Sequence, residues 1–328
     1  MIVWITIAFL VVGLLLIWIG SDWMTDSLVP VAKFLGTSYI AIASILVSIM
    51  LSVPEVFTAI YSYYMGFLDI SLGVIIGSVM ANIGLMTGLS AIIKPLHVNK
   101  EMVVRDGLFA LFIIAILFTQ GSDFAYSRTE GWVLLLLFVP YAVNVWFSEK
   151  WAERNKKQKL LELEKDLEDI GFGPFKLAPG PFAFILGVGL LLIGSYLFSR
   201  SLVSIAELTT IPSAIIGLTI GAIGPTVPNI FSAIQGTLKN YKTIAIAETF
   251  GSNIFTLLVT MGLVIVLKPM EITTRLLFFD IAWMGIMHLV MLLFIIKGFI
   301  AKESAILRGE GIALLFFYLI LLAVNVIF

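Results

Sequence analysis

Four short stretches of this sequence carry polar side chains within runs that are otherwise apolar. They are residues 52–55 and 77–85 in the first half of the chain, and residues 224–229 and 251–259 in the second half. Together they offer a carboxylate, amides, hydroxyls and backbone carbonyls. Na⁺ and Ca²⁺ prefer oxygen ligands of these kinds. The four stretches therefore predict a cation-binding site.

The spacing of several polar residues places them on common helix faces. Ser78 and Asn82 are four residues apart, and Ser252 and Thr256 repeat that spacing. Residues four apart share one face of a helix, so each pair can contribute two ligands to one site. Hydroxyls in membrane helices often bond only to their own helix, so each one alone is also compatible with a structural role.

The other two stretches contain prolines that interrupt helical hydrogen bonding. Pro54 and Pro228 lack an N–H, which frees the carbonyls of Met50 and Gly224, four residues earlier. A free carbonyl inside a membrane is tolerated only where another group satisfies it, and a bound cation can do so. We therefore expect the second and seventh helices to be broken, with both carbonyls as candidate ligands.

Glu55 is the strongest single candidate in the sequence. It follows Pro54 directly and lies about one turn from Ser52. A carboxylate in the bilayer interior costs at least ~2.5 kcal/mol and marks a functional site by default. We expect Glu55 to line the cation site.

The composition requires a membrane environment for the elements that carry these residues. The 328-residue chain is 60% apolar and 12% charged, with a mean hydropathy of +1.08. A membrane helix needs roughly 20 apolar residues. The sequence predicts an all-α integral membrane protein with ten transmembrane helices, at about 2–20, 27–63, 70–93, 104–120, 130–148, 179–199, 203–237, 243–267, 273–296 and 307–327.

Other classes of function lack their residues. The chain has no cysteine, which excludes thiolate metal ligands and cysteine nucleophiles. No basic cluster with interleaved aromatics predicts nucleic-acid binding, and the motifs of an intramembrane hydrolase are absent from the sequence. We expect neither an enzyme nor a cofactor.

The two halves of the chain repeat one another at a distance of 174 residues. Gly20 falls on Gly194, Pro54 on Pro228, Gly77-Ser78 on Gly251-Ser252, Gly88 on Gly262 and Lys94-Pro95 on Lys268-Pro269. Five spans in each repeat, an odd number, force the second copy to enter the membrane from the opposite side. Inverted repeats with interrupted helices are typical of secondary transporters. We expect five-helix repeats at 1–148 and 179–328, joined by a linker at 149–178.

The distribution of Lys and Arg predicts the orientation in the cell membrane. With both termini outside, sixteen of the 20 basic residues fall on the cytoplasmic side, six of them between positions 149 and 170. Cytoplasmic loops carry an excess of Lys and Arg. We therefore expect a multi-pass protein with external termini and a cytoplasmic linker, which begins as an amphipathic helix.

The motifs resemble those of the calcium/cation antiporter superfamily, particularly the prokaryotic Na⁺/Ca²⁺ exchangers. The family motif G-T-S-[LV]-P-E is similar to residues 50–55 and 224–229, and its second motif, G-S-x-x-x-[ND], is similar to residues 77–82 and 251–256. The resemblance implies an antiporter of small cations, Na⁺ and Ca²⁺, with alternating access and a monomeric transport unit. It implies a site lined by Ser52, Glu55, Ser78 and Asn82 from one repeat and by Thr226, Asn229, Ser252 and Thr256 from the other.

Two departures from the family pattern reduce the charge of the expected site. Asn229 stands where the family has a glutamate, and Thr256 where an aspartate is common. One carboxylate against Ca²⁺ leaves a net charge of +1, which a poorly solvated pocket disfavours, whereas against Na⁺ it leaves zero. Glu248 precedes Ser252 by one turn, and it is either an accessory acid or an interfacial charge.

Because of these departures, two functions other than Na⁺/Ca²⁺ exchange stay open. One is a monovalent-cation or H⁺-coupled exchanger with a charge-reduced site. The other is a membrane scaffold or sensor with a transporter-like fold that no longer carries ions.

Overall fold

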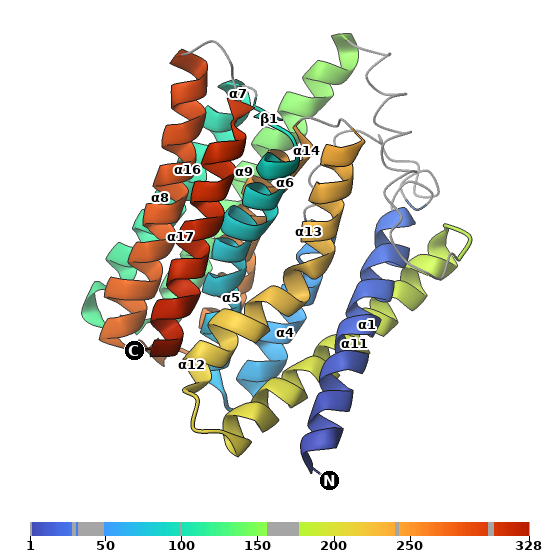
Figure 1. The fold of residues 1–328 in the computed structure, drawn as a ribbon, viewed down its shortest axis with the longest axis vertical. Coiled ribbons are helices and arrows are strands. Elements are labelled where there is room, and N and C mark those ends of the chain that lie inside the picture. The colour runs from blue at the N-terminus through green and yellow to red at the C-terminus, as the bar shows by residue number, and fades with distance from the viewer. Residues whose placement is uncertain are drawn as a thin grey trace.

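The computed structural model describes residues 2–27, 31, 49–98, 100–155, 177–239, 243–300 and 305–327. Most of the predicted linker, residues 156–176, lies outside this part of the chain, and so does the amphipathic helix expected there. The described residues are almost entirely helical, as their composition requires (Figure 1).

The described residues form ten helical spans, five on each side of the predicted linker. Eight of the described helices are long and apolar enough to cross a membrane. The first repeat contains α1 (Ile2–Asp26), α4 (Val53–Tyr64), α5 (Leu68–Ala81) continued by η1 (Asn82–Thr87) and α6 (Gly88–Ile93), α7 (Lys100–Met102) continued by η2 (Val103–Gly107) and α8 (Leu108–Gln120), the short η3 (Gly121–Asp123), and α9 (Arg128–Asn155). The second contains α11 (Pro181–Leu208), α12 (Ser213–Ile216) continued by η4 (Gly217–Gly221) and α13 (Ala222–Leu238), α14 (Ile244–Phe255) continued by η5 (Thr256–Thr260) and α15 (Met261–Leu267), η6 (Leu276–Ile281) continued by α16 (Ala282–Ile300), and α17 (Arg308–Ile327).

Two antiparallel strand pairs join the repeats at opposite ends of the bundle. β1 (Leu96–His97) pairs with β4 (Ala305–Ile306), and β2 (Ala125–Tyr126) pairs with β3 (Met270–Glu271). The two chain ends lie at one end of the molecule, and β1 lies at the other, which we call the linker end because α9 runs toward it (Figure 1). In each pair, one strand comes from the first repeat and the other from the second, as an inverted duplication predicts.

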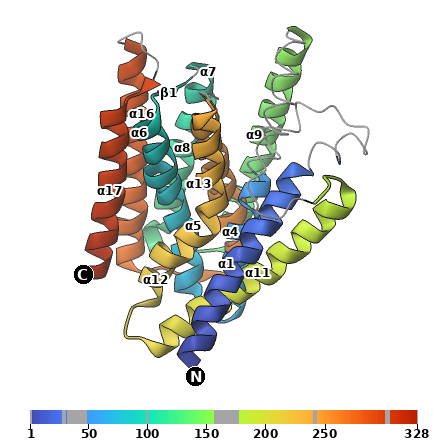
Figure 2. The ribbon, with the colours of Figure 1, turned by 45° about the vertical axis from the view of Figure 1, so that its right-hand side comes forward.

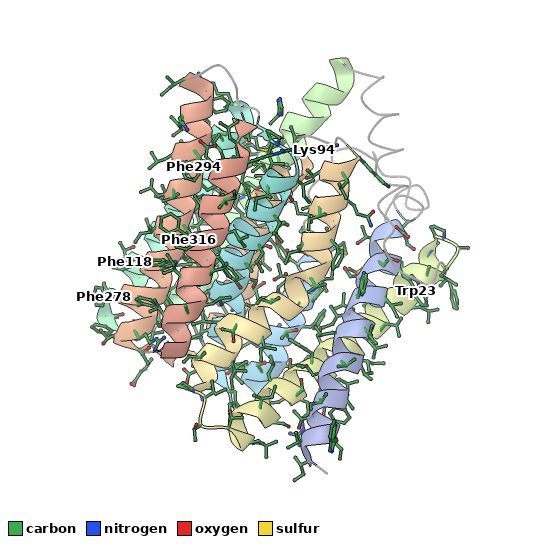
Figure 3. The ribbon with its side chains drawn as sticks, viewed as in Figure 1. Trp23, Lys94, Phe118, Phe278, Phe294 and Phe316 are labelled. Carbon is green, nitrogen blue, oxygen red and sulfur yellow. The ribbon has the colours of Figure 1, made fainter. Side chains whose placement is uncertain are left out.

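Exposed apolar side chains cover the outside of the bundle. Phe278 is 57% exposed and Phe316 is 61% exposed, and both point outward from η6 and α17 (Figure 3). No soluble protein would tolerate so continuous an apolar surface, whereas lipid requires it. Lys94, by contrast, lies at the linker end (Figure 3), where its Nζ donates to the carbonyl of Leu238 at 3.1 Å.

α1 and α11 form a closely packed antiparallel pair at one side of the bundle (Figures 1 and 2). Their contact runs through four glycines that the repeat relates, Gly13 with Gly187 and Gly20 with Gly194. A Cβ added to Gly20 would lie 2.6 Å from the carbonyl oxygen of Gly187, and one added to Gly194 would lie 2.9 Å from that of Gly13. Only glycine permits so close an approach of two backbones, so these glycines allow α1 and α11 to pack in direct backbone contact.

Glycines also hold the other helices that cross between repeats. A Cβ on Gly88 would lie 3.0 Å from the carbonyl oxygen of Gly311, and a Cβ on Gly131 would lie 2.9 Å from that of Gly262. A Cβ on Gly217 would lie 2.5 Å from the carbonyl oxygen of Ile70. The repeats therefore interlock, and the helices that carry the polar stretches meet at their seam.

Span two departs from regular α-helix beside its proline, as expected, whereas span seven departs before its prolines and α13 is continuous through them. α-Helix is interrupted at Ser52, and α4 begins at Val53, one residue before Pro54. Span seven contains the π-helical segment η4 and bends along its course (Figure 1) before α13 continues through Pro225 and Pro228. The π-helical segments η1 and η5 start at Asn82 and Thr256, which the repeat relates. Such segments often mark functional sites.

Candidate cation-binding site

The polar residues from the four stretches meet around the hydroxyl of Ser252 on α14. This oxygen lies 2.7 Å from Oγ of Ser52, and it accepts hydrogen bonds from Nδ2 of Asn82 at 3.2 Å and Nδ2 of Asn229 at 3.2 Å. All four residues are fully buried. Residues up to 200 positions apart are thus brought together where the two repeats meet.

Glu55 joins this cluster through α13. One carboxylate oxygen, Oε1, accepts from Nδ2 of Asn229 at 3.3 Å. It also lies 3.4 Å from Oγ1 of Thr226, which makes its shorter bond, of 2.7 Å, to the carbonyl of Ala222 on its own helix. The side chain is fully buried, and the ion pairs found among the described residues do not include it. An anion held in this way without a basic partner requires a cation or a proton to neutralise it.

Three buried oxygens of the cluster remain without a hydrogen-bond donor in the described part of the chain. They are Oε2 of Glu55, Oδ1 of Asn82 and Oδ1 of Asn229. In each amide, Nδ2 is used within the cluster, which leaves the oxygen as the free atom. Buried acceptors of this kind are usually satisfied, and a hard cation satisfies several at once. The donor set fits Na⁺ or Ca²⁺ better than a transition metal, since no group of three or more His, Cys, Asp or Glu occurs among the described residues.

Not every candidate from the sequence joins the cluster. Ser78 is buried, but its Oγ donates to the carbonyl of Val74 on its own helix. Thr256 is fully buried, and its Oγ1 has no partner among the residues described. The α-carbon of Gly224 packs against α1 and α11, since a Cβ added there would meet Leu14 and Phe198. The hydrogen bonds therefore connect five of the eight candidate side chains, namely Ser52, Glu55, Asn82, Asn229 and Ser252. Thr226 lies at the edge of this cluster, 3.4 Å from Glu55.

Sequence reasoning missed polar residues that support the cluster. Oδ1 of Asn253 accepts from Nδ2 of Asn82 at 3.0 Å, and Thr87 and Thr249 share a hydrogen bond of 2.6 Å. Comparison of the two halves does not point to Asn253, because its equivalent in the first half is the apolar Val79. The only available signal was its place directly after Ser252.

Glu248 is buried rather than interfacial. It is 5% exposed, and its Oε2 accepts from Oγ of Ser232 at 3.4 Å. It lies one turn before Ser252 on α14. The interpretation of Glu248 as an accessory acid stays a prediction.

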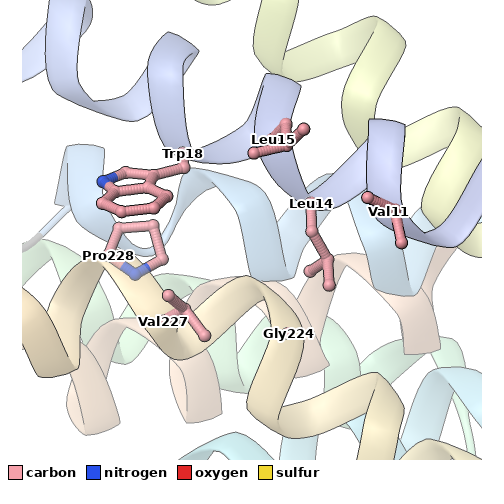
Figure 4. Close-up of a pocket in the computed structure, with 7 residues that line it drawn as sticks. All are labelled: Val11, Leu14, Leu15, Trp18, Gly224, Val227 and Pro228. Carbon is pink, nitrogen blue, oxygen red and sulfur yellow. The ribbon is translucent and has the colours of Figure 1, made fainter. Parts of the chain in front are cut away.

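An apolar cavity of about 270 Å³ lies between α1 and the proline-containing part of α13 (Figure 4). Val11, Leu14, Leu15 and Trp18 line it on α1, opposite Gly224, Val227 and Pro228 on α13 (Figure 4). A cavity of this size and polarity means that the α1 face is loosely packed against the helix that carries Thr226 and Asn229.

We expect Ser252→Ala to weaken cation binding by about 30-fold or more, because two or three hydrogen bonds worth ~1 kcal/mol each no longer orient Asn82 and Asn229. Titration of the purified protein with Na⁺ and Ca²⁺ measures this. Ser201→Ala is the matched control, since that buried hydroxyl bonds only to the carbonyl of Phe198 on its own helix. Equal affinities in wild type and Ser252→Ala would contradict the central place of this hydroxyl.

Several known proteins are similar to this chain in sequence, and a solved structure is similar to it in fold. The chain is 30% identical over 322 residues to an uncharacterized membrane protein of Methanocaldococcus jannaschii, which covers 97% of each chain. It is 29% identical over 354 residues to the sodium/calcium exchanger MaX1 of Methanosarcina acetivorans, which covers 98% of this chain and 99% of that one. A solved structure of the sodium-calcium exchanger NCX_Mj, soaked with 2.5 mM Na⁺ and 0.1 mM Sr²⁺, matches with a TM-score of 0.65 and 28% identity over 98% of this chain and 99% of that chain.

The family profile matches the two halves separately. The profile described as "Sodium/calcium exchanger protein" covers residues 5–147 and 180–327, which leaves out only the linker region and the extreme ends. Together with the buried glutamate and the ten-span fold, these matches confirm the resemblance seen in the motifs. The chain belongs to the sodium/calcium exchanger family of membrane cation antiporters.

Proposed function

We propose that this antiporter exchanges Na⁺ for Ca²⁺ at the site built around Glu55. The observation that carries the proposal is the fully buried Glu55 carboxylate, with one oxygen free beside two free amide oxygens. These oxygens can replace part of the hydration shell of either ion. Because Na⁺ and Ca²⁺ need the same oxygens, one ion must leave before the other binds, which couples their movements.

Alternating access would come from movement of the α1–α11 pair against the remaining helices. The glycine contacts between these two helices let them move as one body, and the apolar cavity beside α13 gives α1 room to slide. The ligands come from one chain, so the transport unit is a monomer. The excess of Lys and Arg at the linker end supports a cytoplasmic linker and external termini.

Flux into proteoliposomes tests the proposal directly. With Na⁺ inside and ⁴⁵Ca²⁺ outside, we expect uptake that stops when the Na⁺ gradient is removed. Uptake driven only by an H⁺ gradient, or exchange of monovalent ions alone, would favour the alternative of a charge-reduced exchanger. The observation that favours that alternative is Asn229, because this amide is neutral where a carboxylate would add a second charge beside Glu55. The absence of any gradient-driven cation flux would contradict exchange altogether.

Asn229→Asp should increase Ca²⁺ affinity by about 10-fold or more. The new carboxylate would lie near Oε1 of Glu55, which is now 3.3 Å from Nδ2 of Asn229. Two carboxylates at that distance repel each other strongly unless a divalent cation lies between them. The thermal stability of the variant should therefore depend on Ca²⁺ more steeply than that of the wild type. Unfolding curves at graded Ca²⁺ concentrations measure this, and identical Ca²⁺ dependence would place the ion elsewhere.

A further inference from the structure

A second buried carboxylate lies beside the Glu55 cluster on the side of the linker end. Glu248 is 5% exposed, and its Oε1 has no hydrogen-bond partner among the described residues. Oε2 contacts only the hydroxyl of Ser232, at 3.4 Å, in the hydrogen bonds found for it. A carboxylate in a membrane protein interior with one weak contact is too costly to serve packing alone.

Glu248 and Ser232 repeat the geometry of the Glu55 cluster one helical turn away. α13 and α14 contact each other through Asn229 and Ser252 at 3.2 Å. Ser232 lies three residues beyond Asn229 on α13, and Glu248 lies four residues before Ser252 on α14. At 1.5 Å of rise per residue, this second polar contact lies ~5 Å from the first, toward the linker end.

The charges of the two carboxylates call for a divalent ion. Glu248 lies one turn from Ser252, which is joined to Glu55 through Asn229. Neither carboxylate takes part in the ion pairs found in the described ranges, which join Arg105 to Asp106 and Lys297 to Glu310. Two anions in a region of low dielectric repel each other and are poorly solvated. Two positive charges are needed to neutralise the two carboxylates. A single Ca²⁺ supplies both charges, whereas Na⁺ would require two bound ions.

We propose that Glu248 and Ser232 form a second cation station, from which Glu248 supplies the negative charge that Glu55 alone cannot give a divalent ion. The inference rests on the proposed exchange at Glu55. Glu248 offers its free Oε1 as a ligand on the linker side of the cluster, and Ca²⁺ passes between the two carboxylates. Na⁺ needs only one carboxylate for neutrality, so Glu248 discriminates in favour of the divalent ion.

The test compares Glu248→Gln with wild type in the purified full-length protein. We expect Ca²⁺ to bind about 30-fold more weakly to the variant, whereas Na⁺ affinity changes by less than about threefold, because only the divalent ion needs the second charge. Calorimetric titration with CaCl₂ and with NaCl measures both. Glu271→Gln is the control, since Glu271 is exposed in β3, and it should leave both affinities unchanged. Ser232→Ala, which keeps the charge, should weaken Ca²⁺ binding by only about threefold.

Three outcomes would overturn the inference. Unchanged Ca²⁺ affinity in Glu248→Gln would remove Glu248 from the site, and an equal loss of Na⁺ and Ca²⁺ affinity would show that it does not discriminate. If Glu248→Gln does not fold, an unchanged Ca²⁺ affinity in Ser232→Ala decides against the station. Failure of the proposed function is distinct, since wild-type protein would then show no Na⁺-driven Ca²⁺ flux.

Discussion

Glu55→Gln should abolish cation exchange and leave the fold intact. The amide keeps the shape of the side chain, and its oxygen can still accept from Asn229, which now donates to Oε1 at 3.3 Å. What is lost is the charge that compensates the ion. Removing one partner from a buried charge pair costs roughly 3–5 kcal/mol, which corresponds to a loss of affinity of more than about 100-fold.

Gradient-driven ⁴⁵Ca²⁺ uptake and the unfolding temperature together check this expectation. We expect uptake at background level with an unfolding temperature, measured without cations, equal to or above that of wild type, because an uncompensated buried anion has been removed. Glu271→Gln again serves as the control for loss of a single acidic residue at an exposed position. Uptake in Glu55→Gln within a few fold of wild type would show that the ion does not bind at Glu55.

Gly187→Val should have the second largest effect, on stability and transport together. A Cβ at Gly187 would lie 2.7 Å from the carbonyl oxygen of Gly20 and 2.9 Å from the backbone nitrogen of Met24. Both atoms belong to backbone, so neither can move aside without separating α1 from α11. Overpacking costs ~1–3 kcal/mol even where side chains can adjust, and we expect at least that cost here.

The same helix supplies a matched control for this substitution. Gly189 is two residues away on α11, and nothing lies within 4 Å of a Cβ added there. Gly189→Val should therefore retain the wild-type unfolding temperature and uptake rate, whereas Gly187→Val loses both or fails to accumulate as a monodisperse protein. Comparable behaviour of the two variants would show that the backbone contact between α1 and α11 does not hold the pair together.

Much of the fold could be predicted from the repeat and from residue composition. The glycines that match across the two halves, such as Gly20 with Gly194 and Gly88 with Gly262, are the positions where backbones from different repeats touch. The duplication thus preserved contacts as well as helices. Proline and polar residues inside apolar runs located the cation-binding region, because hydrocarbon tolerates such residues only for a reason.

Which hydroxyls face the site could not be predicted from spacing. Ser78 and Ser252 are equivalent in the repeat, yet Ser78 bonds to its own helix and Ser252 lies at the centre of the cluster. Their surroundings differ because the two halves differ at nearby equivalent positions. The second half has Asn253 and Glu248 where the first half has Val79 and Val74. A serine in a membrane helix has a local alternative partner, so only the tertiary neighbours decide which bond forms.

The way the repeats interlock restricts what half of this chain could be. α1 packs on α11, α6 on α17, α9 on α15, and each of the two strand pairs takes one strand from either half. A polypeptide of one repeat would leave all of these surfaces uncovered, with bare glycine backbones facing lipid. A half-length ancestor would therefore need to pair with an identical copy inserted in the opposite direction. After fusion, equivalent positions in the two halves could change independently, as Val79 and Asn253 now differ.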